Sequence, residues 1–161
     1  MATIQEQLER THSLIEVARD VLPQGWPNHV VITGSSAAVL RGYDIGRLPG
    51  DLDLCVSHGI YAQLMYPWTT RGVPYSGLKR LPDAGIEAAF RTEVLDYPHL
   101  KVRATKAPTA QGFLVASICD VLALKHKLSR PKDLADIALI ENQTRQRQLA
   151  HPHTRPPVVR V

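Results

Sequence analysis

The sequence predicts an α/β domain of the α+β type, in which helices flank a small, mixed and twisted sheet of four or five strands. Its 161 residues suffice to bury a core, and 44% hydrophobic with 21% charged residues is ordinary for globular proteins. Short β-branched runs alternate along the chain with apolar residues at helical spacing. We expect one domain over residues 1–145 and a flexible tail containing Pro, His and Arg over residues 146–161.

The first part of the chain predicts helices and strands from local signals. Apolar residues at helical spacing predict an amphipathic helix over about the first twenty residues, which turn formers then end. Runs of β-branched residues and strict polar–apolar alternation each predict a strand, and Ser57 is a typical N-cap. After the first helix we expect a strand at 29–33, a helix at 37–40, a strand at 51–56 and a short helix after Ser57.

The second part of the chain has weaker signals. Gly, Pro and Tyr residues between 68 and 85 predict a long loop, with a hairpin as the alternative. Ser117 followed by Asp120 predicts a helix N-terminus, and the polar sequence from Asn142 onward predicts the end of the last helix. The remaining expected elements are a strand at 86–90, a short element at 96–103, a strand at 112–116, and helices from 117 and 131.

Composition excludes several functional classes. No apolar run approaches the roughly 20 residues that span a bilayer, so we expect a cytoplasmic protein without a membrane partner. Cys55 and Cys119 form no CxxC pair and lie in apolar stretches, which favours buried thiols over a disulfide or zinc site. The net charge of +4 and pI near 9.3 favour a polyanionic partner such as a nucleotide or nucleic acid.

Two carboxylates on one expected strand are candidate metal ligands. Side chains two apart in a strand share a face, so Asp51 and Asp53 project together while Leu52 and Leu54 face the other way. Mg²⁺ and Mn²⁺ prefer oxygen ligands, and one or two carboxylates with substrate phosphates commonly hold such an ion. The alternative is that one Asp caps a loop while the other is solvated.

A Gly-Ser turn precedes these carboxylates. Gly34 and Ser35 follow an expected strand and open a helix, where backbone N–H groups and a hydroxyl can bind phosphates, although many such pairs are simple turns. Strand, Gly-Ser, short helix and Asp-Leu-Asp-Leu together resemble the DNA polymerase beta-like nucleotidyltransferase superfamily. Two departures are the fifteen residues from Ser36 to Gly50 and Pro49 in the place of a common Thr.

A second block resembles the small bacterial AbiEii-type nucleotidyltransferases. It comprises the helix that carries Lys125 and the segment Ser129-Arg130-Pro131-Lys132-Asp133-Leu134-Ala135-Asp136. The resemblance implies that Lys125 contacts nucleotide phosphates in catalysis. For Lys132 and Asp136 on the following helix, the alternative to a role in the site is a simple exposed ion pair. With the first block it implies a nucleotide site of Gly34, Ser35, Ser36, Arg47, Lys125, Arg130, Lys132, Asp133 and Asp136.

The superfamily often has a third carboxylate on a later strand, which serves as a general base or metal ligand. Glu87 is the first candidate, and Glu93 and Asp96 are its rivals. Together with Asp51 and Asp53 it completes the catalytic residues that the resemblance implies.

The resulting hypothesis is a Mg²⁺- or Mn²⁺-dependent enzyme that moves a nucleoside monophosphate from an NTP to an acceptor hydroxyl. The acceptor could be RNA, including tRNA, a protein or a small molecule. The AbiEii resemblance also suggests a toxin of a toxin–antitoxin pair, with a cognate antitoxin as partner. The alternatives are a catalytically silent binding module of the same fold and a nucleic-acid-binding protein.

Overall fold

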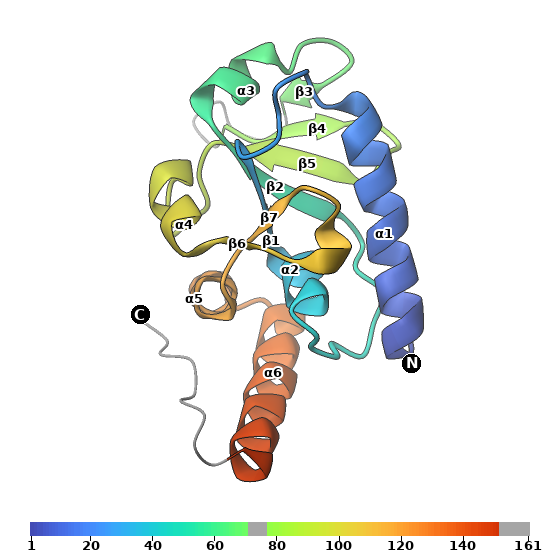
Figure 1. Cartoon of the computed structure of the whole chain (residues 1–161), viewed down its shortest axis with the longest axis vertical. Coiled ribbons are helices and arrows are strands. Elements are labelled where there is room, and N and C mark those ends of the chain that lie inside the picture. The colour runs from blue at the N-terminus through green and yellow to red at the C-terminus, as the bar shows by residue number, and fades with distance from the viewer. Residues whose placement is uncertain (71–76, 152–161) are drawn as a thin grey trace.

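The computed structural model describes residues 1–70 and 77–151, which form a mixed α/β fold as predicted (Figure 1). The described part contains six α-helices, one 3₁₀ turn and seven strands. In order, these are α1 (Ile4–Val21), β1 (Val30–Thr33), α2 (Gly34–Leu40), β2 (Leu52–Val56), α3 (His58–Gln63), β3 (Thr69–Thr70), β4 (Lys79–Leu81), β5 (Ile86–Ala89), α4 (Tyr97–Arg103), β6 (Thr105–Lys106), η2 (Pro108–Ala110), β7 (Leu114–Val115), α5 (Ile118–Leu128) and α6 (Pro131–Ala150).

The strands form one mixed sheet in the order β3-β4-β5-β2-β1-β7-β6. The central β1 and β2 are antiparallel, whereas β2 with β5 and β1 with β7 are parallel. The sheet exceeds the four or five strands expected because it also contains the short edge strands β3 and β6, of two residues each, and β4, of three residues, between β3 and β5. The antiparallel pairing of β3 with β4 supports the hairpin alternative for residues 68–85, of which 71–76 lie outside the described residues.

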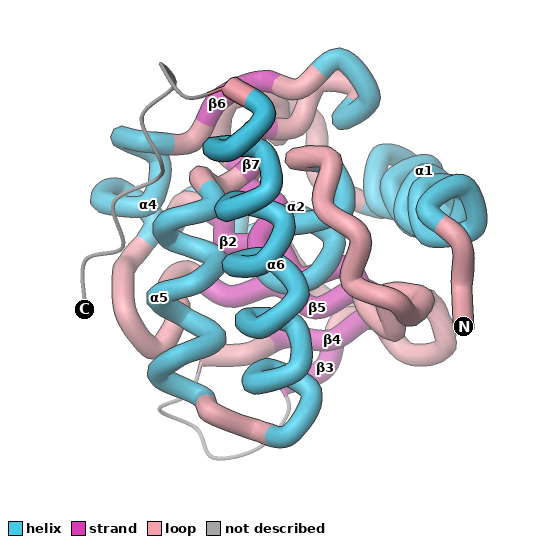
Figure 2. Tube along the Cα trace, turned by 90° about the horizontal axis from the view of Figure 1, so that it is seen from below, coloured by secondary structure: helices cyan, strands magenta, loops and turns pink. Residues whose placement is uncertain are grey.

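The helices surround the sheet on three sides. In Figure 1, α1 runs along one side, α4 lies on the opposite side, and α5 and α6 lie at the lower end. Figure 2, viewed from below, places α5 and α6 in front of the sheet between α4 and α1. Fully buried side chains from α1, β1, β2 and β5 form the centre of the core, among them Ile15, Ile32, Leu52 and Ile86.

The last helix is longer than the sequence predicts. It continues past Asn142 to Ala150, so residues 146–150 belong to α6 rather than to the expected tail. Tertiary contacts extend the helix: Arg147 donates a 2.6 Å hydrogen bond to the carbonyl of Gly42, and its guanidinium lies 4.1 Å from the centre of the Tyr43 ring. The rest of the expected tail, residues 152–161, lies outside the described residues.

Two compositional expectations can be compared with the structure. Cys55 is buried and Cys119 is half-buried, and both are free thiols. Among the described residues, no helix combines the length and apolarity that crossing a membrane requires.

Candidate active site

Three carboxylates meet where β2 and β5 lie side by side. Asp53 on β2 is paired in parallel register with Glu87 on β5, so both side chains project from the same face of the sheet. Asp51 precedes β2 by one residue, and its side chain is 41% exposed. Leu52 and Leu54 are buried on the opposite face, as the alternation predicts.

The surroundings of Asp53 disfavour the charged form of its carboxyl group. Burial raises its pKa to about 7, and the negative charges of Glu87 and Asp51 act in the same direction. The positive charges of Lys125 and Lys132 lower the pKa and only partly compensate. A carboxyl group that is half-protonated near neutral pH beside two other carboxylates favours a bound cation, because a cation removes the repulsion among them.

The turn before α2 lies directly against Asp53. Gly34 has φ +67°, a left-handed conformation that L side chains rarely adopt. A Cβ atom at this position would lie 2.6 Å from Oδ2 of Asp53. Gly34 therefore allows the backbone of the Gly-Ser turn to approach the carboxylates more closely than any other residue could.

A hollow of about 200 Å³ lies over Asp51 and Asp53, between the Gly-Ser turn and the start of α6. Most of the residues that the sequence assigns to the site line it: Gly34, Ser35, Arg47, Asp51, Asp53, Lys125, Arg130, Lys132 and Asp133. Ser36 does not, because it is fully buried and donates a 3.3 Å hydrogen bond to the backbone carbonyl of Asp51. Its role is to position Asp51 rather than to touch a ligand.

Lys125 lines the first hollow and also belongs to a buried network. Its side chain is 4% exposed, and its Nζ donates to Oδ2 of Asp136 at 2.7 Å and to Oγ of Ser35 at 3.0 Å. Nη2 of Arg47 donates to the same two acceptors at 2.6 and 2.9 Å. Asp136, whose side chain is 1% exposed, therefore joins α6 to α5, to the Gly-Ser turn and to the loop before β2.

The start of α6 supplies the other charged residues of the hollow. Arg130 donates to Asp133 through Nε at 2.6 Å and Nη2 at 3.2 Å. Burial acts to raise the pKa of Asp133, but the hydrogen bonds from Arg130 outweigh it and leave this pKa below its ordinary value. Lys132 is exposed on the rim, and because Asp136 is buried, the alternative of an exposed Lys132–Asp136 pair does not hold.

The long segment before Asp51 is fixed by residues that the sequence interpretation missed. Gln7, fully buried on α1, donates a 2.7 Å hydrogen bond to the carboxylate of Asp44 and accepts a hydrogen bond from the backbone N–H of Ile45. Arg10 donates 3.3 and 3.1 Å hydrogen bonds to the carbonyls of residues 49 and 50. The extra residues of this segment thus span the distance to α1 and return to β2. Gln7 could have been found, because it lies at helical spacing from the buried Leu14 and Ala18.

The candidates for a third carboxylate lie in different places. Glu87 lies beside Asp53, and Glu93 lines a second hollow of about 260 Å³ that also includes Glu87. Asp96 instead caps α4, where its side chain accepts from the backbone N–H of His99 at 3.3 Å. The sequence hypothesis does not include Arg80, a cation on β4 that lies opposite Glu87. Nη2 of Arg80 lies 4.0 Å from Oδ1 of Asp51.

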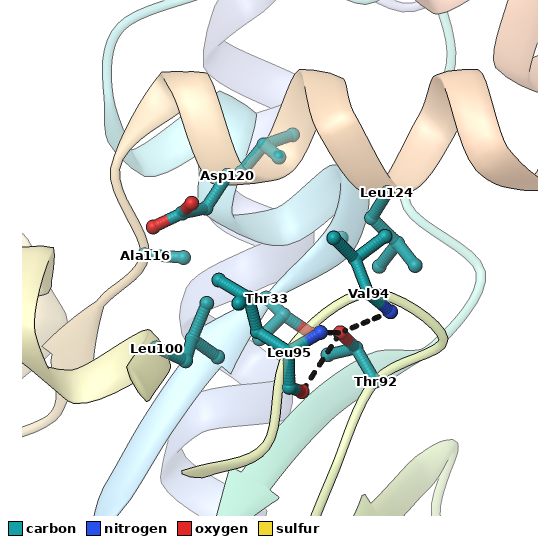
Figure 3. Close-up of a pocket in the computed structure, with 10 residues that line it drawn as sticks. Thr33, Thr92, Val94, Leu95, Leu100, Ala116, Asp120 and Leu124 are labelled. Atoms are coloured by element: carbon teal, nitrogen blue, oxygen red, sulfur yellow. Dashed lines mark hydrogen bonds between the residues drawn. The ribbon is translucent and has the colours of Figure 1, made fainter. Parts of the chain in front are cut away.

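A third, much smaller hollow lies beneath α5 (Figure 3). Its volume of about 10 Å³ holds about one water molecule, and Leu95, Leu100 and Leu124 are among its lining residues. Thr92 Oγ1 accepts from the backbone N–H groups of Val94 and Leu95 at 3.2 and 2.9 Å and fixes the adjoining loop. This hollow is a packing gap and has no room for a nucleotide.

The donor set fits a divalent cation that a substrate helps to bind. In residues 1–70 and 77–151, no group of three or more His, Cys, Asp or Glu side chains is placed to hold a metal ion. Mg²⁺ does not need such a group, because it commonly takes one or two carboxylates, several waters and phosphate oxygens. Asp51 and Asp53 both line the first hollow and would supply the carboxylate part of such a site.

Comparisons with known proteins identify no relative. A scan against models of protein families, a search of curated proteins and a search of solved structures each found no match. A functional proposal must therefore rest on the residues that surround the two hollows that Asp53 lines.

Proposed function

We propose that this protein is a Mg²⁺-dependent nucleotidyltransferase of the DNA polymerase beta-like superfamily, which moves a nucleoside monophosphate from an NTP to an acceptor hydroxyl. The observation that carries the proposal is the cluster of Asp51, Asp53 and Glu87, in which burial and the neighbouring negative charges raise the pKa of Asp53 to about 7. Asp51 and Asp53 line the first hollow, and Asp53 and Glu87 line the second. The exposed Lys132 and the half-exposed Arg130 border the first hollow.

Asp51 and Asp53 would hold the Mg²⁺ or Mn²⁺ ion. When bound, such an ion neutralises negative charge on phosphate oxygens and on the carboxylates. Both carboxylates are accessible from the first hollow, which leaves one side of the site open to the phosphates of a nucleotide.

The triphosphate would lie between the Gly-Ser turn and the first turn of α6. Lys132 is the lysine best placed to donate to phosphate oxygens, because Lys125 is buried and paired with Asp136. Lys125 and Arg47 would act on the nucleotide indirectly, since both donate to Ser35 Oγ and fix the position of that hydroxyl. Arg130 adds a guanidinium, the group best suited to bind phosphate in a bidentate manner.

Transfer requires the acceptor oxygen to attack the α-phosphorus while the bond to pyrophosphate breaks. Glu87 would accept the proton of the acceptor hydroxyl, because its carboxylate lies beside Asp53 and lines the second hollow. The pyrophosphate would leave on the side of Lys132 and Arg130, which offset its charge. RNA or tRNA, a protein side chain and a small molecule are all chemically possible acceptors, and a toxin role with a cognate antitoxin is one biological form of this activity.

The first test is calorimetry of each NTP with the full chain, with and without Mg²⁺. The proposal expects Mg²⁺-dependent binding of at least one NTP, which Asp53→Asn abolishes and which Asp20→Asn, an exposed control on α1, leaves unchanged. Glu87→Gln keeps nucleotide binding and loses transfer. No metal-dependent binding of any NTP would refute the proposal.

A second candidate is a nucleotide-binding module without transferase activity. It is favoured by two observations: Lys125 is locked to Asp136, and the described residues contain no complete metal-ligand set. Transfer of label from α-³²P-NTPs to candidate acceptors or to water distinguishes the two functions. Nucleotide binding with no label transfer to RNA, protein or small hydroxyl compounds would favour the silent module.

A further inference from the structure

The two hollows meet at a short stretch of shared wall. Leu124, Leu128, Asp53 and Arg130 line both of them. Among the described residues, Asp53 and Arg130 are the only charged side chains that do so. If the proposed function holds, on which this inference rests, the nucleotide occupies the first hollow and the acceptor hydroxyl reaches Glu87 through the second. The α-phosphoryl group that moves between them must therefore pass the shared wall.

A buried carboxylate fixes Arg130 at this wall. Nε of Arg130 donates to Oδ2 of Asp133 at 2.6 Å, and Nη2 donates to Oδ1 at 3.2 Å. The same carboxylate accepts a 3.1 Å hydrogen bond from the backbone N–H of Arg130 at the start of α6. The side chain of Asp133 is 2% exposed, whereas that of Arg130 is 51% exposed. Asp133 thus orients a guanidinium that remains accessible from both hollows.

The neighbouring charges also place Arg130 between the two hollows. Its hydrogen bonds with Asp133 raise the pKa of Arg130, and the negative charges of Asp53 and Glu93 act in the same direction. Asp53 lines both hollows, and Glu93 lines the second. Asp133 engages Nε and one N–H of Nη2, so the two N–H groups of Nη1 are the donors best able to turn toward a ligand. A phosphoryl group at the shared wall lies within reach of such donors.

Lys132 lies on a different part of the wall. It is exposed in the first turn of α6 and lines the first hollow but not the second. Its ammonium is therefore placed for phosphates that stay in the first hollow throughout the reaction. In a nucleotidyl transfer these are the two phosphates that leave as pyrophosphate.

We propose that Arg130 contacts the α-phosphoryl group that is transferred, that Lys132 contacts the pyrophosphate part of the nucleotide, and that Asp133 is the positioning residue of Arg130. The acceptor oxygen bonds to the α-phosphorus as its proton passes to Glu87, and the electron pair of the broken P–O bond leaves with pyrophosphate. Arg130 then donates to the α-phosphoryl oxygens on both sides of the transfer, where a charge-assisted hydrogen bond offsets their negative charge. Each cation at the start of α6 thus has its own phosphate.

The test compares three ligands in the presence of Mg²⁺: the NTP that binds best in the calorimetric test, its monophosphate, and inorganic pyrophosphate. Calorimetry measures the affinity of the full chain for the NTP, and ligand-observed NMR measures the two weaker ligands. Arg130→Gln should weaken the NTP and the monophosphate about tenfold each and leave pyrophosphate unchanged, as expected for the loss of one charge-assisted hydrogen bond. Lys132→Gln should weaken the NTP and pyrophosphate and leave the monophosphate unchanged.

Asp133→Asn tests the positioning role. A neutral amide cannot accept both guanidinium hydrogen bonds, so this variant should weaken the monophosphate by about three- to tenfold and leave pyrophosphate unchanged. The double variant with Arg130→Gln should bind the monophosphate no more weakly than Arg130→Gln alone, because both changes remove the same contact. A merely structural role of Asp133 would weaken all three ligands alike. Glu141→Gln, a half-exposed acidic position on the same helix, is the control and should change none of them. Urea denaturation identifies conditions in which each variant stays folded.

The outcomes separate this inference from the proposed function. An equal loss of monophosphate and pyrophosphate in Arg130→Gln, a loss of pyrophosphate alone, or no binding of the monophosphate to the wild type at millimolar concentration would each overturn the role of Arg130. Unchanged monophosphate binding in Asp133→Asn would overturn the positioning role. Nucleotide binding by the wild type stands in all of these cases. If no NTP binds the wild type with Mg²⁺, the proposed function fails and this assignment fails with it.

Discussion

Replacement of the carboxylate at the centre of the buried network should lower the stability of the protein and weaken the proposed nucleotide site. Oδ2 of Asp136 accepts from Arg47 at 2.6 Å, Lys125 at 2.7 Å and Ser35 at 3.2 Å. Asp136→Asn has nearly the same volume but carries no charge. Lys125 would then keep Asp133, at 3.9 Å, as an ion-pair partner.

The structure sets the magnitude of this effect. Removal of one partner from a buried ion pair costs about 3–5 kcal/mol, because the other charge stays buried without compensation. Asp133 still offers Lys125 a weak partner, so we expect a loss near the lower limit, about 3 kcal/mol of unfolding free energy. Glu141→Gln on the same helix is the control. The side chain of Glu141 is 45% exposed and lies 3.7 Å from His126, so this substitution should lower the unfolding free energy by at most about 0.5 kcal/mol.

Urea denaturation measures the stability change, and calorimetry under conditions where the variant stays folded measures nucleotide binding. Because the common acceptor of Ser35 and Arg47 becomes a neutral amide that cannot serve both donors and Lys125 equally well, we expect NTP affinity to fall about tenfold, as for one or two weakened hydrogen bonds. The double variant Lys125→Met, Asp136→Leu removes both buried charges and should recover much of the stability but not the affinity. Unfolding free energy of Asp136→Asn within 1 kcal/mol of wild type would refute this account of the network.

Three further predictions follow from the structure. Mg²⁺-dependent NTP binding should weaken about tenfold per pH unit below about 7, because protons and the ion compete for Asp53. Without Mg²⁺, the stability measured by thermal denaturation should fall as the pH rises from about 4 to about 7. Over this range the raised pKa of Asp53 disfavours its ionisation in the folded state. Gly34→Ala should cost about 1–3 kcal/mol in urea denaturation and weaken Mg²⁺ binding, whereas Gly50→Ala, which has open space around it, should not. Arg147→Ala should lower the unfolding free energy by about 1 kcal/mol, because it removes the hydrogen bond to Gly42 and the contact with the Tyr43 ring. Arg145→Ala, at an exposed position on the same helix, should lower it by less. Equal effects of the two substitutions would contradict the contact between α6 and the loop before β2.

Elements whose signals are local were predictable from the sequence. The alternation that begins at Asp51 predicts β2, and Ser57 caps α3 with a 3.3 Å hydrogen bond from the backbone of Ile60. Ser117 likewise caps α5, where its Oγ accepts from the backbone N–H of Asp120. In each case, the residues that determine the element lie within one turn or one strand of each other, so no knowledge of the fold is needed.

Elements that depend on tertiary contacts were not predictable in the same way. The edge strands β3 and β6 have two residues each, too few for a periodic pattern, and exist because a neighbouring strand supplies hydrogen-bond partners. The end of α6 is polar, and its extension past Asn142 depends on residues about a hundred positions away. Gln143, for example, donates to the backbone carbonyl of Asp44 at 2.7 Å.

The environment of Lys125 shows that part of the site was within reach of the sequence. Residues 118, 121, 122 and 125 are spaced as one face of a helix, and the first three are Ile, Val and Leu. A lysine on an apolar helix face is buried, and a buried ammonium must pair with a carboxylate. Asp133 and Asp136, three apart on the next helix, were the nearest candidates in the sequence. The same periodicity therefore favours a lysine that positions Ser35, as Lys125 does, and in the proposed function it assigns the contact with phosphate to Lys132, on the exposed side of α6.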